Sequence, residues 1–185
     1  MVLTESTELA LGTPAPDFSL PEPLTGRIVS RRDFADRPLF VLFMCNHCPY
    51  VVHLLDALVD TAAWLDGHGI ATVAISSNDV RTHPADAPER MAALAGERGF
   101  GFPYLHDESQ AVARAYQAVC TPDPYLFDAR HRLVYRGQFD GSRPGRGEAD
   151  GADIRRAARA LLDTGEVPVP HRPSVGCSIK WSGRD

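Results

Sequence analysis

Residues 39–50 read LFVLFMCNHCPY, in which a continuous apolar run leads directly into a Cys-x-x-Cys turn. A short apolar run preceded by Pro38 is typical of a strand buried on both faces, as in a parallel sheet between helices. From Val51 to Leu65, apolar side chains recur every three or four residues, which predicts an amphipathic helix. Pro49 is compatible with the first turn of that helix, where its missing N–H is no loss. The segment therefore predicts a strand, a turn that carries both cysteines, and a helix.

Further strands and helices alternate along the rest of the chain. Extended segments are expected at 70–75, 102–105, 124–127 and 132–136, and helices at 87–98, 108–117 and 153–162. The last two strands would form a hairpin, and the remaining segments are an extended arm at 12–23 and loops at 80–86 and 141–151. This alternation indicates an α/β sandwich. We expect residues 1–168 to form one domain and residues 169–185 a tail packed on it.

Composition and charge narrow the class of protein. Of the 185 residues, 44% are hydrophobic and 23% charged, which is ordinary for a soluble globular protein. A net charge of −5 with scattered basic residues argues against a nucleic-acid partner. The N-terminus has no signal-peptide pattern, and the longest apolar run, at 39–44, is far too short to cross a membrane. We therefore expect a cytoplasmic protein without a membrane partner, and the sequence leaves its oligomeric state open. Its four cysteines then suit catalysis or metal binding better than structural disulfides.

A Cys-x-x-Cys turn at the start of a helix has a direct chemical meaning. The partial positive charge of the helix N-terminus and its unpaired N–H groups favour a thiolate at Cys45, and the thiolate is the species that attacks disulfides. Cys48 follows one turn later on the same side, so we expect an exposed Cys45 to attack and a partly shielded Cys48 to resolve. His47 either fills an exposed turn position or lowers the thiol pKa further, which would make the disulfide more oxidising.

Four segments carry a resemblance to a known family. Residues 43–50, FMCNHCPY, resemble the active-site turn of the thioredoxin-like superfamily, and more narrowly that of its peroxiredoxin-like AhpC/TSA branch. Residues 12–20 are similar to the first segment of that superfamily, residues 120–128 to the segment with its cis-proline, and residues 174–181 to the tail of the narrower branch. The resemblance implies a thioredoxin fold, in which helices sandwich a central mixed sheet, with an N-terminal extension and a C-terminal tail.

The same resemblance implies a substrate site opposite the cysteines. Pro122 would be the cis-proline, and we prefer it to Pro124 because it lies six residues before Asp128, as in relatives that end this strand with an aspartate. Thr121 would then offer backbone groups that pair with a bound extended substrate. Asn46, inside the cysteine turn, is assigned to the same substrate site.

The sequence departs from the peroxiredoxin pattern at two positions. Those enzymes place a threonine or serine three residues before the peroxide-attacking cysteine and a proline four residues earlier still. If Cys48 is aligned with that cysteine, Cys45 and Val41 fill the two positions. The hydroxyl that helps to orient a peroxide is then absent, which weakens a peroxidase assignment, although an exposed thiolate can still reduce peroxide slowly.

The other two cysteines each have two interpretations. Cys120 lies two residues before Pro122, so it is either a third redox thiol or metal ligand near the turn, or an inert buried side chain. Cys177 lies on a tail that can fold back. It is either a distant resolving cysteine, or it packs the tail against the domain together with Ile179 and Trp181.

These observations favour a thiol–disulfide oxidoreductase that acts through a mixed disulfide and needs no cofactor. Its partner would be a protein or a small molecule that carries a disulfide or thiol. A first alternative is a thiol peroxidase that uses Cys45 or Cys48. A second alternative is a non-catalytic protein that binds Cu(I) or Zn(II) through both cysteines and a histidine such as His47 or His53.

Overall fold

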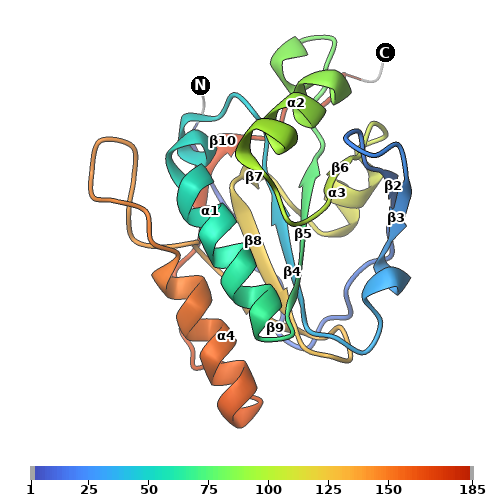
Figure 1. The fold of residues 1–185 in the computed structure, drawn as a ribbon. Helices are drawn as coiled ribbons and strands as arrows, with labels where there is room; N and C mark the ends of the chain where they lie inside the picture. The colour runs from blue at the N-terminus through green and yellow to red at the C-terminus, as the bar shows by residue number, and fades with distance from the viewer. Residues whose placement is uncertain (1–2, 184–185) are drawn as a thin grey trace.

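A five-stranded mixed sheet lies at the centre of the molecule in the computed structural model, which describes residues 3–183 (Figure 1). Its strands lie in the order β6 (Tyr104–His106), β5 (Ala71–Ser76), β4 (Leu39–Phe43), β8 (Asp123–Phe127) and β9 (Leu133–Arg136). β4, β5 and β6 are parallel, whereas β8 runs antiparallel to both β4 and β9. Helices connect the parallel strands, as such pairing requires, and β8 and β9 form the expected hairpin.

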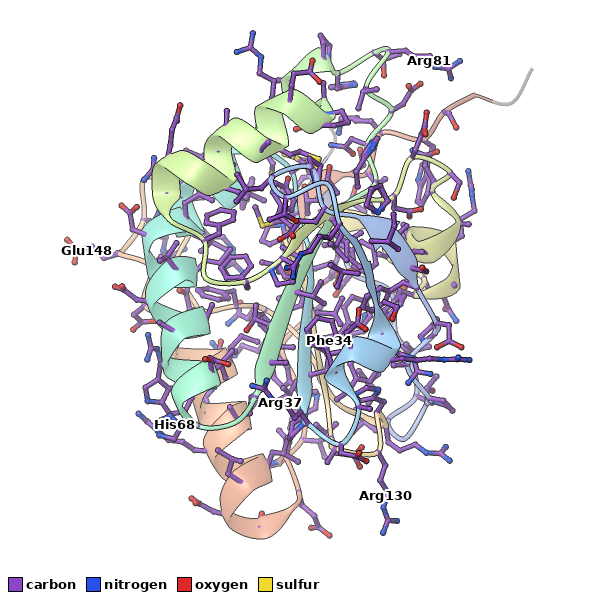
Figure 2. All side chains as sticks on the ribbon, turned by 45° about the vertical axis from the view of Figure 1, so that its right-hand side comes forward. Phe34, Arg37, His68, Arg81, Arg130 and Glu148 are labelled. Carbon is purple, nitrogen blue, oxygen red and sulfur yellow. The ribbon has the colours of Figure 1, made fainter. Side chains whose placement is uncertain are left out.

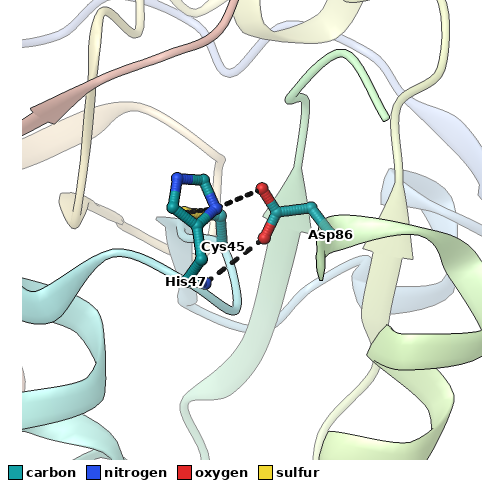
Figure 3. Close-up of side chains that lie close together, drawn as sticks. All are labelled: Cys45, His47 and Asp86. Carbon is teal, nitrogen blue, oxygen red and sulfur yellow. Dashed lines mark hydrogen bonds and ion pairs between the residues drawn. The ribbon is translucent and has the colours of Figure 1, made fainter. Parts of the chain in front are cut away.

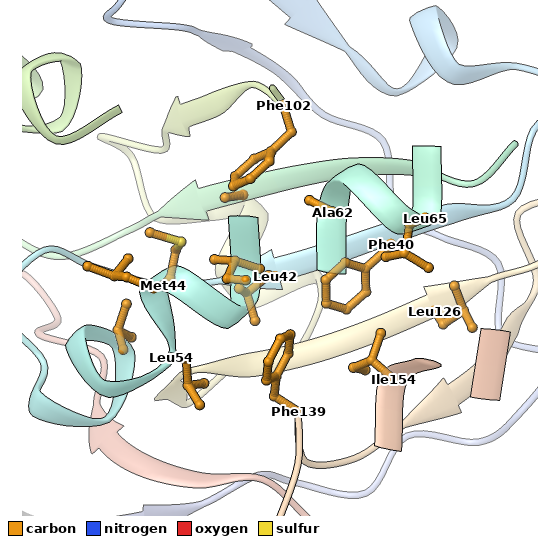
Figure 4. Packing of buried hydrophobic residues seen from close by; sticks show 14 of the residues in the cluster. Phe40, Leu42, Met44, Leu54, Ala62, Leu65, Phe102, Leu126, Phe139 and Ile154 are labelled. Carbon is orange, nitrogen blue, oxygen red and sulfur yellow. The ribbon is translucent and has the colours of Figure 1, made fainter. Parts of the chain in front are cut away.

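Helices cover both faces of this sheet. They are α1 (Pro49–Gly67), α2 (Pro88–Arg98), α3 (Ala111–Ala115) and α4 (Ala152–Thr164). Because side chains alternate along a strand, Phe40 and Leu42 point into one buried cluster with α1, α2 and α4, which Figure 4 shows. Val41 and Phe43 point into a second cluster with α3. This packing holds α1 against β4, so the turn between them is fixed at one end of the sheet.

Two smaller sheets complete the fold. β2 (Ser19–Pro21) and β3 (Ile28–Ser30) form a hairpin that leads into the 3₁₀ helix η1 (Arg31–Phe34). β1 (Leu3–Glu5), β10 (Val175–Ser178) and β7 (Cys120–Thr121) form an antiparallel sheet with β10 in the middle, visible beside the start of α1 in Figure 1. This second sheet places β10 directly beside β7, the segment that precedes Pro122, and β1 on the other edge of β10.

The predicted mixed sheet with helices on both faces is confirmed, and the differences concern short elements. The helix expected at 108–117 is shorter, Ala111–Ala115, and the loop expected at 80–86 contains a 3₁₀ helix, η2 (Pro84–Asp86). The expected arm contains β2, and the expected tail contains β10. Both strands are only three or four residues long, too short to show an alternating pattern of their own, and β10 is held by distant partners, β1 and β7.

The surface carries charged side chains on well-separated parts of the molecule. In Figure 2, Arg81 and Arg130 project from opposite ends, and Glu148 projects from a third position. Among residues 3–183, no helix combines the length and the apolar character that crossing a membrane demands.

Candidate active site

The cysteine turn lies between the end of β4 and the start of α1. Cys48 is the residue that caps α1, and Pro49 occupies the first helical position, where its lack of an N–H is harmless. The Cys48 carbonyl accepts the first helical hydrogen bond, from the Val52 N–H at 2.9 Å. Cys48, rather than Cys45, therefore lies at the positive end of the helix.

Both sulfur atoms of the turn are buried. Cys45 is 1% exposed and Cys48 0%, so the expectation of an exposed Cys45 is wrong. Both residues belong to the large core cluster on the α1 face of the sheet, and Cys177 of β10 belongs to the same cluster. The sequence pattern of the turn does not reveal which distant segments pack around these two sulfur atoms. All four cysteines are free thiols.

Cys48 is the acidic thiol of the pair. Its pKa is lowered from 9.0 to about 4, chiefly because the Cys45 thiol donates a hydrogen bond to the Cys48 sulfur. The Cys177 thiol, the Val51 backbone N–H and the Thr121 hydroxyl stabilise the same thiolate, while burial opposes its formation. The donors outweigh burial because they converge on one sulfur at a helix N-terminus.

Cys45 shows the opposite behaviour. Its pKa is raised far above 9.0, first because ionisation would remove the hydrogen bond that it donates to Cys48, then because of burial and the nearby negative charge of Asp86. The prediction that the helix acidifies Cys45 is therefore wrong. The Thr121 hydroxyl, 3.6 Å from the Cys45 sulfur, opposes the shift but does not overcome it.

The Thr121–Pro122 peptide bond is cis, as the resemblance implied, and the segment faces the cysteines. The Thr121 carbonyl oxygen lies 3.2 Å from Cys48 Sγ and accepts a hydrogen bond from its thiol form. The backbone of Thr121 is already paired, because Cys177 of β10 lies opposite it in the antiparallel register. The chain's own tail thus occupies the edge at which the sequence analysis placed an extended substrate.

A buried carboxylate, Asp86 of η2, organises the other side of the turn (Figure 3). Its Oδ1 accepts hydrogen bonds from the backbone N–H groups of Asn46, at 2.8 Å, and His47, at 3.4 Å. Its Oδ2 accepts from His47 Nδ1, at 2.7 Å, and from Asn78 Nδ2, at 2.8 Å. The sequence does not indicate a role for Asp86, since an aspartate in a loop 40 residues from the turn carries no local signal.

The side chains of Asn46 and His47 are held by neighbouring groups. The Asn46 amide donates to the Ala85 carbonyl at 3.0 Å and accepts from the Tyr104 hydroxyl at 3.0 Å, so both of its ends are engaged within the protein. The His47 ring stacks on His83 with ring centres 5.0 Å apart. Burial and the charge of His47 lower the pKa of His83. Asn46 therefore shapes the turn through contacts that the sequence did not predict.

Cys45, His47 and Asp86 also form a group of potential metal ligands. Their ligand atoms lie within 4.8 Å of one another, and His47 Nδ1 lies 3.9 Å from the Cys45 sulfur. Both Asp86 oxygens, however, already accept two N–H hydrogen bonds each, which a metal ion would have to displace. His53, the other histidine considered, lies 2.9 Å from Ser142 through Nε2. The N–H groups around Asp86 therefore fit a carboxylate held by hydrogen bonds better than a carboxylate that binds a metal ion.

Cys120 and Cys177 differ in their relation to the turn. Cys120 is fully buried and donates a weak hydrogen bond to the Pro122 carbonyl at 3.8 Å. Burial and the charge of Asp123 raise the pKa of Cys120. Cys177, 3% exposed, contacts the Cys48 sulfur directly, and burial together with this contact raises its pKa to about 12. Of the two accessory thiols, Cys177 is the one that meets the cysteine pair.

A mixed sheet between helices, with a Cys-x-x-Cys turn opposite a cis-proline, defines the class of thioredoxin-like redox proteins. Residues 11–136 match the AhpC/TSA family, and the chain belongs to that family. No curated protein matches the chain.

Solved structures share this fold. A conserved, uncharacterised protein from Geobacillus kaustophilus is 46% identical, with a TM-score of 0.96 and coverage of 100% of this chain and 99% of the other. A thiol:disulfide interchange protein from Chlorobium tepidum is 18% identical, with a TM-score of 0.64 and coverage of 84% and 99%. The peroxidoxin BcpB from Mycobacterium tuberculosis is 19% identical, with a TM-score of 0.62 and coverage of 84% and 97%. At these low identities, the last two structures share the fold with this chain.

Proposed function

We propose that this protein is a thiol–disulfide oxidoreductase in which Cys48 is the attacking thiolate and Cys45 closes the disulfide. The observation that carries the proposal is the position of Cys48, which caps the start of α1 with its sulfur 3.2 Å from the carbonyl oxygen of Thr121, next to the cis-proline. A hydrogen bond from the Cys45 thiol lowers the pKa of Cys48 to about 4. A thiolate at neutral pH beside a protonated partner thiol is the arrangement that disulfide exchange requires. The roles of the two cysteines are the reverse of those predicted from the sequence.

The exchange proceeds in two steps. The Cys48 thiolate attacks one sulfur of a substrate disulfide, forms a mixed disulfide, and releases the first substrate thiolate. The Cys45 thiol then gives up its proton and attacks the Cys48 sulfur, which releases the second substrate group as a thiol. Two electrons pass from the cysteine pair to the substrate. Since the stabilised thiolate favours the reduced pair, we expect a reduction potential above the value of about −270 mV typical of thioredoxin.

Turnover of a disulfide substrate by the purified protein tests this assignment. We expect dithiothreitol-linked reduction of insulin by the wild type, and a loss on the order of 10³-fold in Cys48→Ser, since the attacking group is removed. Cys120→Ser, which also removes one buried thiol, serves as the matched control and retains activity. Full activity in Cys48→Ser would contradict the proposal.

Two further measurements separate the alternatives. Fast, saturable consumption of hydrogen peroxide without disulfide reduction would favour a thiol peroxidase. If Cys48 is aligned with the peroxide-attacking cysteine, Val41 of the second buried cluster stands where peroxiredoxins have a proline. Cys45 then stands where they have a hydroxyl, which argues against the peroxidase alternative. A stoichiometric metal in the purified protein, with neither activity, would favour metal binding instead.

A further inference from the structure

We propose that β10 occupies the place of an extended substrate strand, and that its Cys177 is a third redox thiol that exchanges disulfide bonds with Cys48. This inference rests on the proposed function and adds a partner thiol from the chain itself.

Backbone pairing and a side-chain hydrogen bond hold β10 in one position against β7. Cys177 pairs with Thr121 and Ser178 with Cys120, which continues the chain of backbone contacts up to the cis-proline. The Ser174 hydroxyl donates to the Pro122 carbonyl at 2.6 Å and fixes the start of the strand. On its other edge β10 pairs with β1, so the strand is held from both sides.

Gly176 shows how closely the two backbones approach. A Cβ at this position would lie 2.0 Å from the Thr121 carbonyl oxygen and 3.1 Å from Pro122 Cδ. Neither atom belongs to a flexible side chain, so a larger residue would push β10 away from β7. Glycine at this position is therefore what allows the following residue, Cys177, to reach the cysteine pair.

Cys48 lies between two thiols. The Cys45 thiol donates to its sulfur from the turn, and the Cys177 thiol donates from β10. Cys177, Cys48 and Cys45 belong to one buried cluster, so the contact is sheltered from water. On ionisation, Cys45 would face the negative charge of Asp86, whereas Cys177 would face the positive charge of Lys180. Cys177 is thus placed to attack a disulfide on Cys48.

The disulfide exchange needs no reagent other than the substrate disulfide. Because Cys48 is fully buried and β10 is paired with β7, the exchange requires β10 to separate from β7 before a disulfide can reach Cys48. The Cys48 thiolate then attacks that disulfide, with release of one thiolate. When β10 returns, Cys177 gives up its proton and attacks the Cys48 sulfur, which forms the Cys48–Cys177 disulfide and releases the second group as a thiol. Cys45 can then displace Cys177 from Cys48, which moves the disulfide into the turn without net oxidation.

Disulfide mapping after oxidation tests this step. The reduced full-length Cys45→Ser protein is treated with glutathione disulfide, quenched with acid and N-ethylmaleimide, and mapped by mass spectrometry. We expect a transient mixed disulfide of glutathione with Cys48, followed by a linked pair of peptides that contain Cys48 and Cys177. With Cys177→Ser added, the mixed disulfide should persist roughly ten times longer or more, since the neighbouring thiol is gone. Adding Cys120→Ser instead should leave its lifetime unchanged.

A second variant pair tests the seating of β10 without removing a thiol. Gly176→Ala should decrease the Cys48–Cys177 linkage at least several-fold, whereas Gly183→Ala, whose Cβ meets nothing within 4 Å, should not. If Cys48 forms the mixed disulfide but Cys177→Ser does not prolong it, the role of Cys177 is refuted while the proposed function stands. If Cys48 forms no mixed disulfide in any variant, both proposals are refuted.

Discussion

The groups on the two sides of the cysteine turn shift the pKa values of two chemically identical thiols in opposite directions. Cys45 stays protonated because it donates a hydrogen bond to Cys48, because it is buried, and because the carboxylate of Asp86 places negative charge near it on the side of η2. On the side of α1 and β10, thiol, hydroxyl and backbone N–H donors converge on Cys48, and its pKa falls to about 4. Position in the motif therefore does not decide which cysteine ionises. The donors and charges around each sulfur decide it.

The largest effect is expected when the main hydrogen-bond donor to Cys48 is removed. In Cys45→Ala, the pKa of Cys48 should rise from about 4 toward its ordinary value of 9.0. The absorbance of the thiolate at 240 nm, followed against pH in the reduced protein, measures this change. An unchanged titration in Cys45→Ala would mean that the helix and β10 alone stabilise the thiolate.

The same pKa predicts how stability depends on pH. A group whose pKa is depressed on folding contributes stability that is fully present above its unfolded value, here 9.0, and is lost as the pH falls toward about 4. Urea unfolding of the reduced wild type and Cys48→Ser between pH 5 and 8 measures the contribution as a difference. We expect the difference to grow with pH by up to about 1.4 kcal/mol per pH unit. A difference that is constant over this range would contradict the low pKa.

A smaller effect is expected on the other side of the turn. Asp86→Asn replaces an acceptor of four N–H hydrogen bonds by a group that is itself partly a donor, which should destabilise the protein by about 2–3 kcal/mol. The pKa of Cys45 should fall as the negative charge disappears. Asp56→Asn, which alters an exposed ion pair with Arg98, is the control and should cost less than about 1 kcal/mol. Equal stability of the two variants would mean that the hydrogen bonds to Asp86 do not stabilise the protein.

The smallest effect is expected at Cys120, which lies next to the site without joining it. Cys120→Ala removes a buried sulfur whose contact with the Pro122 carbonyl is long, so we expect a loss of about 1 kcal/mol or less. Disulfide reduction should be unchanged. If Cys120→Ala is folded by circular dichroism but strongly inactivated, this thiol takes part in the reaction.

Much of the fold follows from local sequence. The apolar run of 39–44 and the periodicity from Val51 to Leu65 predict β4 and α1, and these two elements place Cys45 and Cys48 in one turn. The hairpin of β8 and β9 also follows from its pattern. Such elements are predictable because each contains enough residues to show its own period.

The chemistry of the site depended on tertiary structure. Asp86 lies 40 residues from the backbone N–H that it binds, and β10 meets β7 across more than 50 residues, so no window of sequence contains either contact. The sequence by itself determined that two cysteines share a strand-to-helix turn opposite a cis-proline. Only the folded chain decided that both sulfurs are buried, that Cys48 is the acidic one, and that Cys177 meets it. The physical reason is that burial and pKa follow from all the groups around an atom, most of which are distant in sequence.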